Sequence, residues 1–166
     1  MKIPFSPPDI TIEEANEVRD ALLSGWITTG PRVKEFERQI AKMCHLPLNA
    51  ETNQPNVVCL SSATAAMEMA YRLIGIKQGD EVIVPAYTYT ATASSVLHNG
   101  GKLVFVDSQP GTFEMDYEKL AKAITPRTKV IAAVDIAGVV CDYEKIFEIV
   151  NRPEICSMFK AESDIQ

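Results

Sequence analysis

The sequence lacks several features that would assign it at once to a class of proteins. Among its 166 residues, no apolar run reaches the roughly 20 residues that a membrane span needs. The first ten, MKIPFSPPDI, hold one lysine and no apolar stretch of the signal-peptide type. Acidic residues outnumber basic ones by 22 to 16, which gives a formal net charge of −6. Nucleic acids and anionic membranes bind basic surfaces, so we expect neither as a partner.

Cysteine and histidine are also scarce, with four and two residues. The cysteines stand far apart and form no C-x-x-C pair, and the histidines do not recur at a metal-ligand spacing. We therefore expect neither a zinc site nor a disulfide framework, and we predict a reducing, cytoplasmic location. The sequence also has no P-loop and no glycine-rich dinucleotide fingerprint.

Residues 1–56 are predicted to form an N-terminal region of helices and loops. Thr11 and Glu14 have the spacing of a capping box, and Gly25 is placed to end the helix that follows. A second helix is predicted over residues 32–44, with Val33, Phe36, Ile40 and Met43 on one face. The loop GWITTGPR separates the two helices, and residues 46–56 are predicted to form a polar surface loop.

Residues 57–166 alternate between short apolar runs and helical segments. The runs are continuous, as in strands that are covered on both faces, and they span residues 57–60, 81–86, 102–107 and 129–136. Helices are predicted at 63–75, 89–98, 116–124 and 142–151, with Asp116 and Asp142 as N-caps for the last two. This order predicts an α/β domain with a mainly parallel, doubly wound sheet. Because no further strand follows, we expect the chain to be a fragment of a longer protein.

Polar side chains gather where the predicted strands end, which is where ligands bind in open α/β sheets. They are Ser61, Ser62, Thr64, Tyr87, Tyr89, Asp107, Ser108 and residues 135–138. Small residues at the start of the 63–75 helix would let a phosphate reach free backbone amides. The alternative is that Ser61 or Ser62 only caps that helix.

Two tyrosines follow the second predicted strand, at positions 87 and 89. Either ring could lie against a planar ligand, because aromatic faces favour offset stacking. The alternative is a half-buried core tyrosine whose hydroxyl is satisfied at the surface. A phosphate site and a flat aromatic ring on neighbouring strand ends together predict a planar, phosphorylated cofactor.

Several stretches in register resemble a known family. SGWITTGP, SSATAAMEMAYRLIGIKQGDEVIVPAYTYTATASSV, VFVDSQPGTFEMDYEKLAKAITPRTKVIAAVDIAG and CDYEKIF are similar to the N-terminal half of the large domain of DegT/DnrJ sugar aminotransferases. The resemblance implies an aspartate-aminotransferase-like large domain, of pyridoxal-phosphate fold type I, with an incomplete sheet. Residues 57–166 would then be a partial cofactor-binding domain.

The resemblance also implies the cofactor contacts. In the S-A-T turn, Ser62, Ala63 (through its amide) and Thr64 would hold the phosphate of pyridoxal 5′-phosphate. Tyr89 falls on the aromatic position that stacks on the pyridine ring. No metal ligand is implied.

A second set of residues is implied on the substrate side. Thr28, Thr29 and Gly30 lie in a loop that resembles the family's substrate-side loop near the interface of a homodimer. Asp135 stands where many relatives have a histidine. The implied substrates are a nucleotide-linked keto-sugar and an amino donor such as glutamate, for amino-sugar or cell-surface polysaccharide biosynthesis.

The catalytic residues of the family are expected after residue 166. They are an aspartate that binds the pyridine nitrogen and a lysine that forms the Schiff base with the cofactor. Lys160 lies in a polar tail without the aspartate strand, so it is not a substitute. We expect this chain alone to be inactive. Two alternatives stay open: a fragment of a sugar dehydratase of the same family, in which histidine replaces the lysine, and a short non-catalytic protein that binds a phosphorylated ligand.

Overall fold

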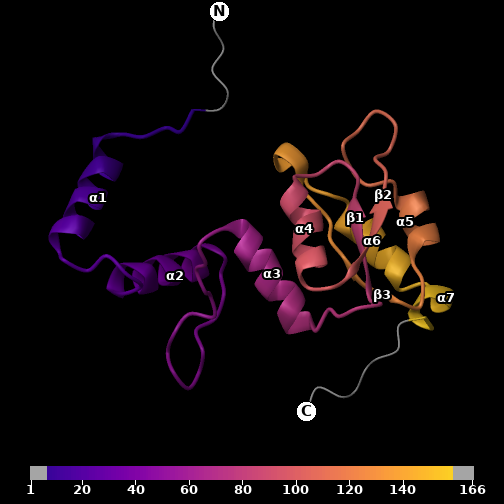
Figure 1. Cartoon of the computed structure of the whole chain (residues 1–166), viewed down its shortest axis with the longest axis horizontal. Coiled ribbons are helices and arrows are strands. Elements are labelled where there is room, and N and C mark those ends of the chain that lie inside the picture. The colour runs from indigo at the N-terminus through magenta and orange to yellow at the C-terminus, as the bar shows by residue number, and fades with distance from the viewer. Residues whose placement is uncertain (1–6, 159–166) are drawn as a thin grey trace, which may run out of the picture. The chain divides into compact units, whose positions relative to one another are not determined.

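The N-terminal part of the fold is a pair of helices. The computed structural model describes residues 7–158, and the chain divides into two compact units between Cys59 and Leu60 (Figure 1). In the first unit, α1 (Ile12–Leu23) begins with the predicted capping box, in which the Glu14 carboxylate accepts a hydrogen bond from the Thr11 amide at 2.6 Å. Helix α2 (Pro31–Met43) starts at a proline, which suits the first turn because its missing N–H would have no partner there.

The apolar face predicted for α2 is largely open within this unit. Val33 and Ile40 are half-buried, whereas Phe36 and Met43 are exposed. Residues 46–56 form the predicted surface loop, which is closed by an isolated bridge between Leu48 and Pro55.

The second unit is an α/β domain with a three-stranded parallel sheet. Its elements are α3 (Ala63–Ile74), β1 (Glu81–Pro85), α4 (Thr90–His98), β2 (Lys102–Val106), α5 (Tyr117–Ala123), β3 (Thr128–Ile131), the short 3-10 turn η1 (Ile136–Gly138), α6 (Tyr143–Val150) and α7 (Pro153–Cys156). The strand order is β2-β1-β3, and β1 pairs in parallel with both neighbours. Asp116 and Asp142 cap α5 and α6 as predicted.

Residues 57–60 do not form the predicted strand, and this corrects the expected count from four strands to three. The segment has no regular secondary structure, and Val58 is 77% exposed. An apolar run favours burial, but a strand also needs a neighbouring strand that offers backbone groups to pair with. No strand in the described part of the chain pairs with this segment. Its Cys59 amide donates instead to the Glu37 carboxylate, at 2.9 Å.

The core lies on both faces of the sheet, as the continuous apolar runs predict. All five residues of β1 are buried. Ile83 packs into one cluster with residues of α5, α6 and α7, whereas Val82 and Val84 belong to a second cluster with residues of α3 and α4. Figure 1 shows these two groups of helices on opposite sides of the strands.

This topology places the first residues of α3 and α4 at the same edge of the sheet. Helix α4 begins five residues after β1 ends, at the carboxyl edge of the strands. Helix α3 ends at Ile74, shortly before β1 begins, so its own start lies toward the carboxyl edge. The Asn99 amide group, after α4, donates to the Glu68 carbonyl of α3 at 3.2 Å and joins the two helices. Among the described residues, no helix has the length and apolar character to cross a membrane.

Candidate functional site

The start of α3 combines a capped helix with unused backbone donors. Ser62 is the N-cap, and its Oγ accepts a hydrogen bond from the Ala65 amide at 3.1 Å. The Ser62 carbonyl accepts from the Ala66 amide, also at 3.1 Å. The amides of Ala63 and Thr64 donate to no acceptor within residues 7–158. The capping and phosphate-binding interpretations are therefore compatible, because the cap uses other groups.

The exposure and charge of this turn suit an anion. Ser61, Ser62 and Ala63 are exposed and Thr64 is half-buried. The first turn of a helix carries roughly half a unit of positive charge. Two amide donors and the Thr64 hydroxyl therefore form a donor set that fits a phosphate group.

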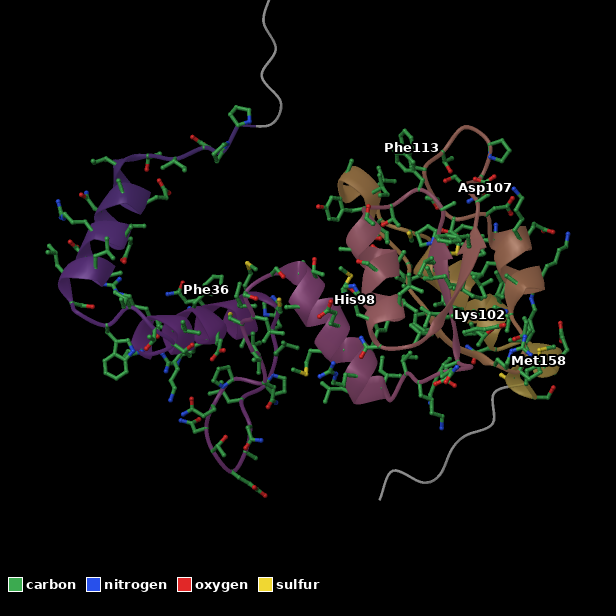
Figure 2. All side chains as sticks on the ribbon, viewed as in Figure 1. Phe36, His98, Lys102, Asp107, Phe113 and Met158 are labelled. Carbon is green, nitrogen blue, oxygen red and sulfur yellow. The ribbon has the colours of Figure 1, made fainter. Side chains whose placement is uncertain are left out.

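The two tyrosines after β1 differ in their surroundings. Tyr87 stacks on Phe113, with ring centroids 5.1 Å apart and an interplanar angle of 23°. Tyr89 is the N-cap residue of α4 and is 81% exposed. Tyr87 is 55% exposed, so Tyr89 is the more exposed of the two rings and the one without a stacking partner among the described residues. Figure 2 shows Phe113 near Asp107 on the loop after β2, at the edge opposite Lys102.

Asp135 lies at the start of η1, after β3, and its carboxylate holds the following loop. Its Oδ1 accepts hydrogen bonds from the Cys141 amide at 2.9 Å and from the Tyr143 hydroxyl at 3.1 Å. The Cys141 amide is the main cause that lowers the pKa of Asp135, with a smaller contribution from Tyr143. Asp135 is therefore a carboxylate near neutral pH, at the carboxyl edge of the sheet. A role toward substrate stays a prediction.

In the N-terminal unit, the loop before α2 is organised around Trp26. The indole Nε1–H donates to the Thr29 carbonyl at 3.1 Å. Gly30 is the N-cap residue of α2, and a Cβ at this position would overlap the indole ring. Thr28 and Thr29 are exposed. The loop thus presents both threonines at the surface, while Gly30 is required by the close approach of Trp26.

Two aromatic residues of these loops were not singled out by the sequence patterns. Phe113 stands in a polar loop, and Trp26 precedes the threonines of the GWITTGPR loop. A large aromatic residue within an otherwise small and polar loop is the signal that points to both. Lys160 lies outside the described residues.

The fold of the chain is similar to that of solved aminotransferases, among them a PMP-form and a PLP-form. Spr1654 of Streptococcus pneumoniae, described as a sugar aminotransferase, matches in its PMP-form with a TM-score of 0.87 and 50% identity, over 98% of this chain and 39% of that chain. Its PLP-form matches with a TM-score of 0.85 and 51% identity, again over 98% of this chain and 39% of that chain. The 3-amino-5-hydroxybenzoic acid synthase matches with a TM-score of 0.75 and 32% identity, over 90% of this chain and 38% of that chain.

The chain belongs to the DegT/DnrJ/EryC1/StrS aminotransferase family, whose model matches residues 8–159. The spore coat polysaccharide biosynthesis protein SpsC of Bacillus subtilis (strain 168) is 37% identical over 147 residues, which are 89% of this chain and 36% of that protein. The chain therefore spans a little over a third of the length of these relatives. These matches confirm the predicted family, fold class and cofactor.

Proposed function

We propose that this chain is the N-terminal part of a pyridoxal-phosphate-dependent aminotransferase that acts on a nucleotide-linked keto-sugar. Two findings support the proposal: the chain's membership of the family and its coverage of only 36% and 39% of SpsC and Spr1654. Among the residues themselves, the observation that carries it is the exposed start of α3 with two unbonded amides.

In this proposal the start of α3 holds the cofactor phosphate. The Ala63 and Thr64 amides and the Thr64 hydroxyl donate hydrogen bonds to it, while Ser62 keeps the helix capped. Charge-assisted hydrogen bonds of this kind are stronger than neutral ones. The exposed Tyr89 ring would stack on the cofactor ring. When bound, the cofactor supplies an electron sink for the carbon that loses its proton.

The substrate side is proposed to include Asp135 and the loop with Thr28, Thr29 and Gly30. Asp135 offers an ionised acceptor for a sugar hydroxyl at the carboxyl edge of the sheet, and Oδ1 is the oxygen that accepts from the Cys141 amide and the Tyr143 hydroxyl. The threonines offer exposed hydroxyl groups. We propose that the 28–30 loop serves the active site of the partner in a homodimer.

The proton transfers of the reaction are assigned to residues beyond this chain. Within residues 1–166 the predicted contacts bind and orient, and no residue is assigned as the acid or base. We therefore propose that the chain alone has no transaminase activity, because binding without a positioned base does not move the proton.

The test uses the complete gene product with pyridoxal phosphate, glutamate and a panel of nucleotide-linked keto-sugars. The expected result is release of more than one equivalent of 2-oxoglutarate per enzyme only when a keto-sugar is present, together with a sugar product in which an amino group replaces the keto oxygen. Loss of water from the sugar without 2-oxoglutarate would identify a dehydratase. An intact mass equal to the 166-residue chain, with no turnover, would favour the non-catalytic alternative.

A further inference from the structure

A groove beside Trp26 joins Thr29 and Gly30 of the substrate-side loop to residues of α2 that have no role assigned above. It has a volume of about 670 Å³, and the residues that line it include Trp26, Thr29, Gly30, Lys34, Glu35 and Arg38. Sites for small molecules and cofactors commonly have volumes of about 300–1,000 Å³. The groove is thus large enough for a ligand of nucleotide size, and it lies entirely within the N-terminal unit.

One wall of this groove is a fixed aromatic ring. The Trp26 indole is held by its hydrogen bond to the Thr29 carbonyl and by its close approach to Gly30. Even so, Trp26 is 57% exposed. An aromatic ring that is held in place yet open to solvent is suited to stacking on a nucleobase, and such stacking tolerates different bases.

The lining also includes two basic side chains, although the whole chain has a net charge of −6. Lys34 and Arg38 are spaced by four residues on α2, so they lie on one face of the helix. The Lys34 ammonium has no ion pair within the described ranges of the chain. The Glu35 carboxylate also lines the groove and pairs with Arg38, so these two charges offset one another and the Lys34 charge remains.

We propose that the groove binds the nucleoside diphosphate portion of a nucleotide-linked sugar. The base stacks on Trp26, and the diphosphate lies near Lys34 and Arg38. A neutral sugar or a free amino acid would use only part of these groups, whereas a nucleoside diphosphate uses the ring and the charges together. The inference rests on the proposed function, because it names the part of the chain that recognises the nucleotide of that substrate.

The test uses the full chain and its own fluorescence. Trp26 is the single tryptophan of the sequence, so all indole emission reports on this groove. Titration with uridine diphosphate is expected to quench the emission saturably. Inorganic pyrophosphate, which has no base, is expected to compete with uridine diphosphate without quenching by itself.

Matched variants test whether uridine diphosphate binds in this groove. The double variant Lys34→Ala/Arg38→Ala is expected to weaken uridine diphosphate binding by about tenfold, since two charge-assisted contacts are lost. Lys42→Ala is the control: it removes one positive charge from the same helix, but Lys42 does not line the groove. It should bind within about twofold of the unmodified chain, because a distant exposed charge is screened. Far-UV circular dichroism checks that each variant is folded.

The absence of saturable quenching would overturn the inference, as would an equal loss of affinity in Lys42→Ala and in the double variant. These outcomes are separable from the proposed function. If the complete gene product aminates a nucleotide-linked keto-sugar while the groove variants bind normally, the function stands and the groove assignment falls. If the groove binds uridine diphosphate but no keto-sugar is aminated, the groove assignment stands and the proposed function falls.

Discussion

At the residue scale, the most strongly perturbed carboxyl group lies at the edge of the sheet opposite the candidate site. Glu81 begins β1 and is 2% exposed. Its carboxylate accepts hydrogen bonds from the Thr125 hydroxyl at 2.6 Å and from the Lys102 ammonium at 3.0 Å. The Arg127 guanidinium donates two more, at 2.9 and 3.2 Å. These contacts tie the start of β1 to β2 and to the segment that precedes β3.

The hydrogen bond from Thr125 is the largest cause that lowers the pKa of Glu81 to about 2, against the opposing effect of burial. A lowered carboxyl pKa adds stability above the unfolded value, and this stability is lost as pH falls. We predict that the free energy of unfolding drops between about pH 5 and pH 2, with Glu81 contributing on the order of 3 kcal/mol. Urea unfolding across this pH range measures it.

The matched variants are Glu81→Gln and Glu118→Gln, the latter at an exposed position on α5. The first should be less stable at pH 7 by about 1–3 kcal/mol and should lose much of the acid sensitivity, because it cannot ionise. The second should behave like the unmodified chain. Equal pH profiles for both variants would show that Glu81 does not govern acid unfolding.

At the element scale, sequence patterns predicted helices better than strands. The capping residues Thr11, Asp116 and Asp142 each bond within their own first turn, so a local pattern is sufficient to predict them. Strand 57–60 was predicted wrongly because pairing depends on a partner distant in sequence. The predicted strand 129–136 is present only over Thr128–Ile131, after which the chain turns into η1.

In the candidate site too, contacts within one helix could be predicted from the sequence, whereas contacts between distant residues could not. That Ser62 caps α3 can be predicted from the residues of that helix alone. That the amides of Ala63 and Thr64 have no acceptor among the described residues can be established only when the position of every nearby acceptor is known. That Tyr87 has a stacking partner depends on Phe113, which is 26 residues further along the chain than Tyr87. The amino-acid pattern alone therefore left both tyrosines open as candidates.

The loop before α2 gives a testable prediction at this scale. Gly30→Ala adds a Cβ that would overlap the Trp26 indole, so the ring has to move and its bond to the Thr29 carbonyl is strained. We expect a red shift of tryptophan emission and a loss of stability of about 1–3 kcal/mol, as in overpacked sites. Thr28→Ala, in the same loop but exposed, is the control. Unchanged emission in Gly30→Ala would contradict the described packing of Trp26.

At the scale of the whole molecule, the two units differ in how much of each is buried. None of the residues of α1 is buried, and in α2 only Ala41 is. The α/β unit instead has a central strand that is buried throughout and two apolar clusters around it. Buried hydrogen bonds exchange slowly because opening them exposes apolar surface to water.

We therefore predict that hydrogen exchange in the isolated chain is fast in α1 and α2 and slow in β1. Mass spectrometry of peptides covering residues 12–23, 31–43 and 81–85 measures the difference. Protection of α1 equal to that of β1 in a monomeric sample would contradict the account. Protection that rises with protein concentration would support the proposed homodimer, because a partner surface would then cover these helices.

The most direct test of the central claim is an amide NMR titration of the chain with pyridoxamine 5′-phosphate. This probe carries the ring and the phosphate of the cofactor but has no aldehyde that reacts with lysines. We predict that the largest progressive shifts belong to Ala63 and Thr64, that Tyr89 shifts with them, and that pyridoxamine without phosphate leaves the two α3 amides unchanged. Shifts confined to other regions, or equal shifts with both compounds, would contradict a phosphate site at the start of α3.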